Sequence, residues 1–166
     1  MATIPKDRIY AVAKFHEGSP ASLHVPEAAN QTYVVGEIGY FDTAGQFAEL
    51  AGDTPAEIYG VSEHDASGVQ ATMGSVWLAN PDTLFEANML EGSAADHVLV
   101  AADLGTVMGI QRVTADSKVY LNSAVKDGAS ARVFVHGLAR GSVLGDTNAR
   151  VLFTFLPKFV QHLATS

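Results

Sequence analysis

The sequence has no cysteine and little positive charge. Without cysteine the chain can form no disulfide, thiolate nucleophile, cysteine-ligated zinc site or iron–sulfur cluster. Its 10 Lys and Arg residues face 18 Asp and Glu residues, which gives a formal net charge of −8. A protein that binds duplex DNA or an anionic membrane needs a basic patch, and no run of Lys or Arg supplies one. We therefore expect neither nucleic acid nor a membrane as partner.

Long hydrophobic runs are missing as well. A helix that spans a bilayer needs about 20 apolar residues. The longest apolar runs, residues 98–102 and 151–156, are only as long as a strand. The first eight residues lack the basic and then apolar order of a signal peptide. We expect a protein that is made and used without secretion.

The common catalytic signatures are also absent. The sequence contains no Gly-x-Ser-x-Gly elbow, no phosphate-binding Gly-x-x-x-x-Gly-Lys loop and no His-Glu-x-x-His motif. Ser, His and Asp residues could form a triad only through tertiary contacts, and no spacing favours a particular set. We predict no enzyme, no catalytic residue, no metal site and no cofactor. None of the six histidines lies two or four residues from another; they are His16, His24, His64, His97, His136 and His162.

The composition is that of a folded chain with few charges. Its 166 residues suit one domain, or one domain with an arm, and 48% of them are hydrophobic. Charged residues make up 17% of the chain, where about 25% is usual. A surface with so little charge suggests that partners cover part of it.

Turn-forming residues recur along the chain from residue 42 onward, and β-branched and aromatic residues fill the segments between them. This pattern predicts an all-β fold, a compact sandwich or small barrel of short strands. The expected strands cover residues 32–35, 57–61, 75–78, 83–86, 119–121, 132–135 and 150–155. Their aromatic residues are expected in the core: Trp77, Phe85, Tyr120, Phe134, Phe153 and Phe155.

The two ends of the chain differ from the middle. We expect residues 1–30 to form an N-terminal arm and loop segment, and residues 31–166 a single β-rich domain. Side chains alternate from Arg8 to Phe15 as in a strand, which either pairs with a neighbouring molecule or belongs to the domain itself. At the other end, residues 155–163 fit a short C-terminal helix that begins near Pro157, or a strand that continues to Val160.

Four stretches carry a resemblance to a known family. Residues 31–42, with a turn and a short strand after them, and then residues 55–62 resemble segments of the capsid decoration (cement) proteins of tailed bacteriophages. The regions 92–110 and 144–155 look similar too. The likeness covers about two thirds of the chain and is one of overall pattern.

The resemblance implies a function. Such proteins sit on the outer surface of an icosahedral head, commonly as trimers, and bridge neighbouring capsomers after the shell expands. It implies the major capsid protein and copies of the chain itself as partners, with a homotrimer as the assembly. Synthesis would take place in the host cytoplasm, and the final location would be the outer surface of the virion.

The N-terminal arm is the part that we expect to touch the capsid. The candidate contact residues are Ile4, Pro5, Arg8 and Tyr10. If the arm acts separately, deletion of residues 2–14 abolishes shell binding and leaves the domain folded.

Two other functions fit the sequence. One is another virion role on a similar β domain, in a tail, a connector or a head fibre, where a particle holds far fewer copies. The other is a small β-barrel enzyme or carbohydrate-binding module. Exposed aromatic residues in loops would favour sugar binding, and a cleft where His, Asp and Glu converge would favour catalysis.

Overall fold

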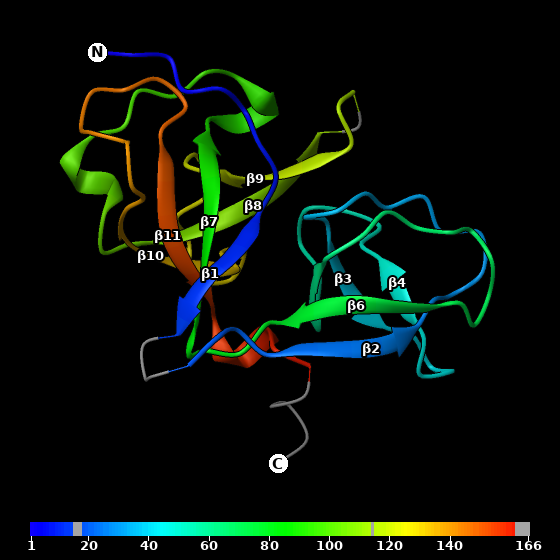
Figure 1. Cartoon of the computed structure of the whole chain (residues 1–166). Helices are drawn as coiled ribbons and strands as arrows, with labels where there is room; N and C mark the ends of the chain where they lie inside the picture. The colour runs from blue at the N-terminus through cyan, green and yellow to red at the C-terminus, as the bar shows by residue number, and fades with distance from the viewer. Residues whose placement is uncertain (15–17, 114, 162–166) are drawn as a thin grey trace.

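The computed structural model describes residues 1–14, 18–113 and 115–161. It confirms the all-β fold, because strands and short 3-10 turns make up its regular structure (Figure 1). The strands are β1 (Tyr10–Lys14), β2 (Ser22–Pro26), β3 (Ile38–Phe41), β4 (Phe47–Glu49), β5 (Gly60–Ser62), β6 (Met73–Leu78), β7 (Thr83–Leu90), β8 (Val107–Val113), β9 (Lys118–Asn122), β10 (Val133–Leu138) and β11 (Arg150–Phe155). The 3-10 turns are η1 (Gly92–Ala94), η2 (Ala101–Asp103) and η3 (Pro157–Phe159).

Five strands form a closed barrel. Their order is β7-β11-β10-β8-β9, and a parallel pairing of β9 with β7 closes the ring. The other pairings in the ring are antiparallel. Only Met89 and Leu90 at the end of β7 pair with β9, so the first half of β7 keeps an edge that is open to a strand from outside the ring.

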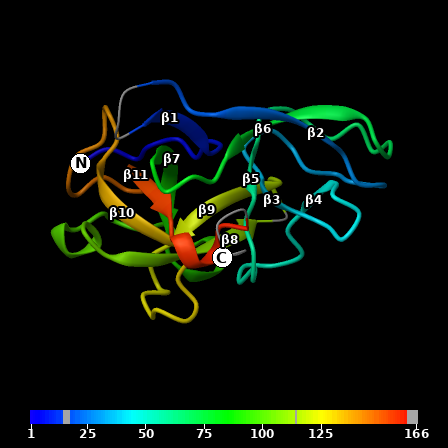
Figure 2. The same cartoon turned by 90° about the horizontal axis from the view of Figure 1, so that it is seen from below.

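A second sheet of five strands lies beside the barrel, in the order β2-β6-β5-β3-β4. Seen from below, the barrel occupies one side of the molecule and this sheet the other (Figure 2). The sheet curls, because the residue after β2, Glu27, forms a bridge with Phe47 of β4. A small cluster of Val25, Tyr33, Phe47 and Val76 fills the curl.

One main core joins the barrel to the second sheet. It contains Phe85, Phe153 and Phe155 of the barrel together with Ile38 and Val61 of the second sheet. Of the six aromatic residues expected in the core, Phe85, Tyr120, Phe153 and Phe155 are buried, and Trp77 and Phe134 are half-buried. The two sheets therefore share one hydrophobic interior.

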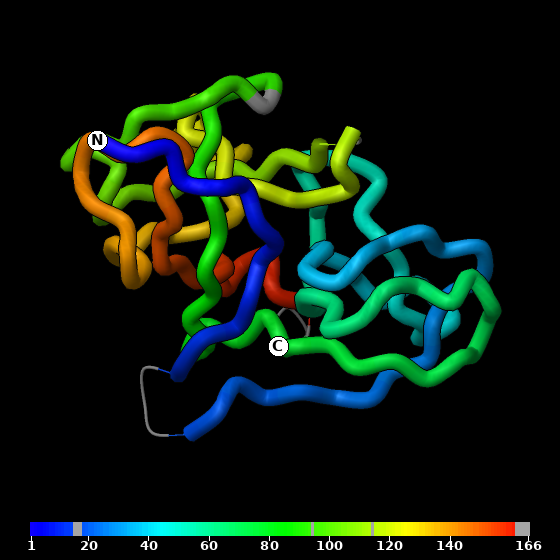
Figure 3. The backbone as a smooth tube through the Cα atoms, turned by 45° about the horizontal axis from the view of Figure 1, so that its top comes forward, coloured from blue at the N-terminus to red at the C-terminus, as the bar shows by residue number. Residues whose placement is uncertain are grey.

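The N-terminal segment is part of this fold and does not extend from it. Strand β1 pairs antiparallel with β7, and Ile9 is fully buried in the main core. Figure 3 shows the N-terminal residues running across the barrel beside β7. Two roles were considered for residues 8–15, a strand that pairs with a neighbouring molecule and a strand of the domain itself. The structure describes this segment up to Lys14 and shows a strand of the domain itself. Because β1 and Ile9 belong to the domain, deletion of residues 2–14 would remove part of its core.

The expected strand at residues 32–35 is not formed. The N–H groups of Thr32, Val34 and Val35 donate to the carboxylates of Glu49, Glu37 and Asp65, at 3.1, 3.0 and 2.9 Å. Carboxylates therefore take the place of a partner strand along this segment.

The C-terminal segment forms one 3-10 turn and then a bridge. Pro157 begins η3, where its missing N–H costs no hydrogen bond. Val160 then bridges to Ile58, and the N–H of Gln161 donates to the carbonyl of Ile58 at 2.8 Å. The longer helix is not formed up to Gln161, and the rest of the range 155–163 lies outside the described residues.

Candidate interaction surface

Exposed apolar side chains gather at one end of the barrel. We call them the apical patch: Met1, Val98, Val100, Val143 and Leu144. Met1 is fully exposed, and the other four have exposed fractions of 47–57%. They come from the N-terminus, the connection between η1 and η2, and the loop between β10 and β11, which meet near the N-terminus in Figure 1.

Backbone hydrogen bonds bind these segments to one another. The N–H of Gly145 donates to the carbonyl of Leu99 at 2.9 Å, and the N–H of Leu99 donates to that of Asp146 at 3.1 Å. On the other side, the N–H of Thr147 donates to the carbonyl of Ala2 at 2.8 Å. The loop between β10 and β11 thus lies between the other two segments and holds them together.

The local geometry explains why the patch faces outward. Leu99 is 1% exposed and points into the core, so the alternation of an extended chain turns Val98 and Val100 to the surface. Gly141 and Gly145 bracket Val143 and Leu144, and both glycines have a positive φ, of 90° and 91°. Other L-residues rarely adopt that conformation, so the glycines fix the bends that present the two side chains.

Asp146 anchors the patch from below. Its carboxylate is buried and accepts hydrogen bonds from the N–H groups of Ala2 and Val143, at 2.8 and 3.0 Å. These two N–H groups, together with the N-terminal ammonium group, hold the pKa of Asp146 below its ordinary value of 3.8. At neutral pH the carboxylate is charged and joins two of the segments.

Two buried asparagines extend this anchoring into the barrel. The side-chain amide of Asn88 in β7 donates to the carbonyls of Pro5 and Asn148, at 3.1 and 2.6 Å. Its oxygen accepts the N–H of Asp7 at 2.8 Å and a guanidinium N–H of Arg150 at 3.0 Å. The side chain of Asn148 in turn donates to Asp96 at 2.8 Å. The segments under the patch are therefore fixed before any partner arrives.

The four predicted contact residues lie along the N-terminal segment. Ile4 is half-buried and donates its N–H to the carbonyl of Thr147 at 2.9 Å, which places it next to the apical patch. Pro5 is exposed. The two residues are therefore near the patch, and their contact with a capsid stays a prediction.

The other two predicted residues lie further along the segment. The carbonyl of Arg8 accepts a hydrogen bond from Arg150 at 3.0 Å. The ring of Tyr10 packs edge-on against Trp77 at 6.4 Å, and its hydroxyl donates to Asp7 at 3.2 Å. The structure thus ties Arg8 and Tyr10 to their own domain and does not group them with the patch.

The fold also assembles a Ser–His–Asp chain that no sequence spacing indicated. Nδ1 of His97 lies 3.2 Å from Oγ of Ser123, and Nε2 of His97 lies 2.8 Å from Oδ2 of Asp103. Lys126 contacts the other oxygen of Asp103 at 2.9 Å. The four residues come from two connections, one before β8 and one after β9.

The Ser–His–Asp chain links the connection before β8 to the connection after β9. Burial opposes the charged form of Asp103, but the N–H of Val100, His97 and Lys126 outweigh it and hold the pKa of Asp103 below its ordinary value. Ser123 is 7% exposed, and the next N–H, that of Ala124, is already bonded to Asn122 at 3.0 Å. The link holds the loop that carries Val98 and Val100.

The described residues contain a hollow away from the apical patch and the Ser–His–Asp chain. It measures about 390 Å³ and lies against Tyr40, Leu50 and Pro55, and Glu57 is the only carboxylate among its lining residues. Within residues 1–14, 18–113 and 115–161, no three side chains of His, Asp or Glu converge as metal ligands would. His16 and His162 lie outside these ranges. No helix in the same ranges is long and apolar enough to cross a bilayer.

Comparisons of the chain with protein-family models, with curated proteins and with solved structures find no match.

Proposed function

We propose that this protein is a structural virion protein that binds the outside of an icosahedral phage capsid and stabilises it by bridging neighbouring capsomers. The observation that carries the proposal is the apical patch, an exposed apolar surface fixed on a rigid barrel end. Apolar patches of this kind on a small β-protein are typical of protein–protein contacts. The likeness of residues 31–42, 55–62, 92–110 and 144–155 to decoration proteins supplies the partner, the major capsid protein.

The rigidity of the patch suits a permanent contact. Binding costs free energy when loops must become ordered at the interface. Here Asp146 and Asn88 already hold the N-terminal segment and the loop between β10 and β11 in place. A preformed surface keeps more of the contact energy for affinity.

Stabilisation of the shell then follows from mass action. A protein that binds only the expanded shell stabilises it by RT ln(1 + [L]/Kd), which is about 2.7 kcal/mol per site at a concentration one hundred times Kd. A homotrimer would hold several capsid subunits at once, and linked binding raises the effective concentration of each further contact. The net charge of −8 also keeps such a protein from binding the genome while DNA is packaged.

The sugar-binding alternative receives less support from the surface. Each aromatic side chain in the described part of the chain is at least partly buried, so none stands free in a loop as a sugar platform. The Ser–His–Asp chain is the nearest approach to an active site, and it is enclosed. The structural role is the better supported of the two.

The test is the copy number in purified particles of the source virus. Quantitative mass spectrometry gives the ratio of this protein to the major capsid protein. Hundreds of copies, at a ratio near one or at a simple fraction of it, are expected. A dozen or fewer copies would assign the protein to a connector or tail, and its absence from particles would overturn the proposal.

A further inference from the structure

We infer that residues 63–68 form a latch that acid opens: a proton on Nε2 of His64 releases these residues from the second sheet and uncovers the small cluster that fills its curl. The latch is the first part of the connection between β5 and β6, which runs round the end of the second sheet away from the barrel (Figure 1). Its release is a property of the isolated chain and does not depend on the capsid function.

The hydrogen bonds of His64 fit a neutral ring. Its Nδ1 lies 2.9 Å from the carbonyl oxygen of Asp65. Because a carbonyl oxygen can only accept, Nδ1 carries the proton and Nε2 carries none. Nε2 is buried without a hydrogen-bond partner and lies against the backbone of Gly74 in β6, where an added Cβ would be 1.7 Å from it. The neutral ring therefore occupies this site without an unsatisfied donor.

A proton on Nε2 changes this balance. It creates a charged N–H donor that is buried against a main chain and has no acceptor, which costs far more free energy than an unpaired neutral nitrogen. Among the ion pairs within residues 1–14, 18–113 and 115–161, none includes His64, so no carboxylate neutralises the new charge in place. The ring has to leave β6 before water can hydrate it.

The titratable groups around the ring do not supply the missing acceptor. Strand β6 has no titratable residue from Met73 to Leu78. Glu27 and Asp65 accept backbone N–H groups, and one oxygen of Glu63 is itself buried without a partner, so opening would hydrate that oxygen as well. The titratable residues on the elements around the ring are Glu27, Tyr33, Glu63, Asp65 and, on β2, His24.

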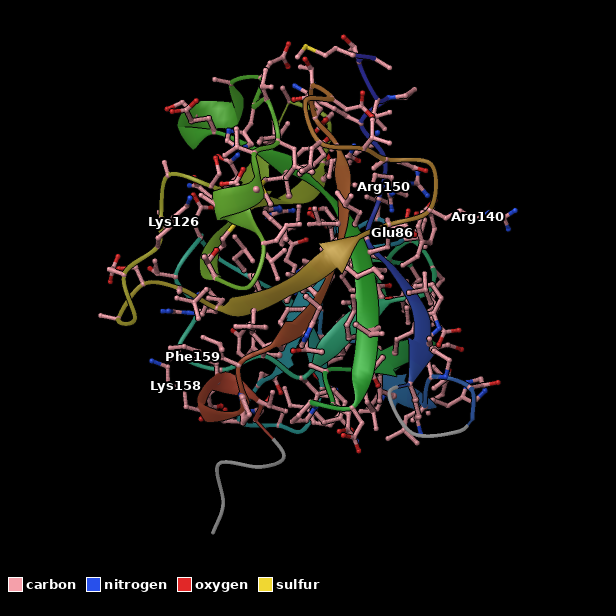
Figure 4. The ribbon with its side chains drawn as sticks, turned by 90° about the vertical axis from the view of Figure 1, so that its left-hand side faces the viewer. Glu86, Lys126, Arg140, Arg150, Lys158 and Phe159 are labelled. Carbon is pink, nitrogen blue, oxygen red and sulfur yellow. The ribbon has the colours of Figure 1, made fainter. Side chains whose placement is uncertain are left out.

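The other described histidines can take up a second proton in place. The two ring nitrogens of His97 face a serine hydroxyl and a carboxylate, and both groups can accept an N–H. Lys126, which binds the same carboxylate, is labelled in Figure 4 on the connection after β9. His24 and His136 are exposed. Among the described residues, His64 is thus the histidine whose buried nitrogen has no partner.

The contacts that hold the latch closed separate two effects of acid. The carboxylate of Glu27 accepts the N–H groups of Ser67 and Gly68, at 2.9 and 2.6 Å, and the N–H of Ala66 donates to the carbonyl of Tyr33 at 2.8 Å. Carboxylates ordinarily become protonated near about pH 4 and imidazoles near about pH 6.5. As pH falls, release through His64 therefore precedes any loosening through a carboxylate.

Release of the latch uncovers apolar side chains. Ala66 packs against the small cluster, whose members are at most 5% exposed. The ring of Tyr33, one of these members, lies 5.9 Å from the ring of His64. When the latch lifts, the cluster faces water or an apolar partner, so acid turns a closed end of the sheet into an exposed apolar surface.

The experiment measures amide hydrogen exchange of the full-length protein at two pH values, about 7.5 and about 5.5, corrected for the intrinsic pH dependence of exchange. The N–H groups of Ala66, Ser67 and Gly68 report on the latch. We expect their protection to fall by about tenfold at the lower pH, because linkage changes an equilibrium by up to about tenfold for each pH unit below the ordinary imidazole value. A fluorescent dye for apolar surfaces should bind more strongly at the lower pH, with the far-ultraviolet circular dichroism unchanged.

Two variants assign the effect to one side chain. His64→Phe keeps a ring that cannot be protonated, so its latch should stay closed at both pH values. The matched control is His24→Phe, where the ring is exposed on β2, and its latch should open as in the unmodified protein. Circular dichroism and the thermal midpoint at the higher pH verify the fold of each variant. NMR of the histidine rings in the unmodified protein measures proton uptake by His64 directly.

The outcomes are distinct. Undiminished protection of the latch at the lower pH would overturn the inference, and so would an equal loss in His64→Phe, because another group would then release it. If the latch of His64→Phe is open at both pH values, the NMR measurement decides: a protonated His64 ring under a protected latch overturns the inference, and a shared midpoint supports it. A loss in the unmodified protein and in His24→Phe that is absent from His64→Phe also supports it.

Discussion

Replacing Ile9 by alanine tests whether the N-terminal segment belongs to the folded core. Ile9 is fully buried and packs in the main cluster, just before β1 pairs with β7. Removing its three outer carbons loses their transfer free energy and leaves a cavity, which costs about 2–5 kcal/mol. For a chain of this size, a loss of about 3 kcal/mol lowers the thermal midpoint by roughly 6–12 °C.

Urea denaturation followed by circular dichroism measures this loss directly, since the midpoint shifts in proportion to the change in free energy of unfolding. The matched control is Val12→Ala in β1, where the side chain is 44% exposed and the expected loss is below about 1 kcal/mol. A loss below about 1 kcal/mol for Ile9→Ala as well would refute the reasoning. It would mean that the segment contributes little to the core.

Three further predictions concern stability. Asn88→Ala removes a buried side chain that makes four hydrogen bonds, to Pro5, Asp7, Asn148 and Arg150. It should lower the free energy of unfolding, measured by urea denaturation, by about 2–4 kcal/mol. No measurable loss would contradict the anchoring role of Asn88. Gly60→Ala should lower the free energy of unfolding by about 1–3 kcal/mol in the same assay, because the added carbon would lie 2.3 Å from the carbonyl oxygen of Trp77. The control is Gly52→Ala, where the added carbon meets open space and stability should stay within about 1 kcal/mol of the unmodified protein. Equal losses for the two variants would contradict this packing. The pKa of Asp103 is lowered in the folded state. The ionised side chain therefore contributes its full stability above the ordinary pKa of 3.8, and this contribution is lost as pH falls through the folded pKa. Asp103→Asn should weaken the dependence of the urea midpoint on acid pH, and an unchanged dependence would count against the link between Asp103, His97 and Lys126.

Much of the fold was predictable because strand signals are local. The β-branched and aromatic residues in 75–78, 83–86, 119–121 and 150–155 lie in β6, β7, β9 and β11. Their alternation is a property of the sequence alone. Strands β3 and β8 were not predicted, since Gly39 and Gly109 interrupt the apolar pattern where a neighbouring side chain needs the space.

The partner of a strand is harder to predict than the strand. The alternation from Arg8 to Phe15 indicated an extended segment, but it held no information on which chain it would join. That choice depends on the free edge of β7 and on the core space that Ile9 fills, which are tertiary features. The same limit explains why residues 32–35 form no strand, since two of the carboxylates that accept their N–H groups, those of Glu49 and Asp65, are distant in sequence.

The candidate surface could be found only in part from the sequence. Residues 98–102 read as one short apolar strand, and nothing local showed that Leu99 points inward and Val98 and Val100 outward. Glycines recur at 137, 141 and 145, a spacing that favours turns around a loop; Gly141 and Gly145 take the positive φ of such bends, whereas Gly137 lies in β10. No local pattern in the sequence indicated that residues 98–100, residues 143–147 and the N-terminus contact one another.

The most direct test of the account is cosedimentation of patch variants with expanded shells of the source virus. In Val143→Ser with Leu144→Ser, the patch loses two exposed apolar side chains; the control, Leu23→Ser with Met73→Ser, removes two from the second sheet. The account predicts that the patch variant binds at least about tenfold more weakly, while the control binds like the unmodified protein. Full binding by the patch variant, or a loss confined to the control, would contradict it.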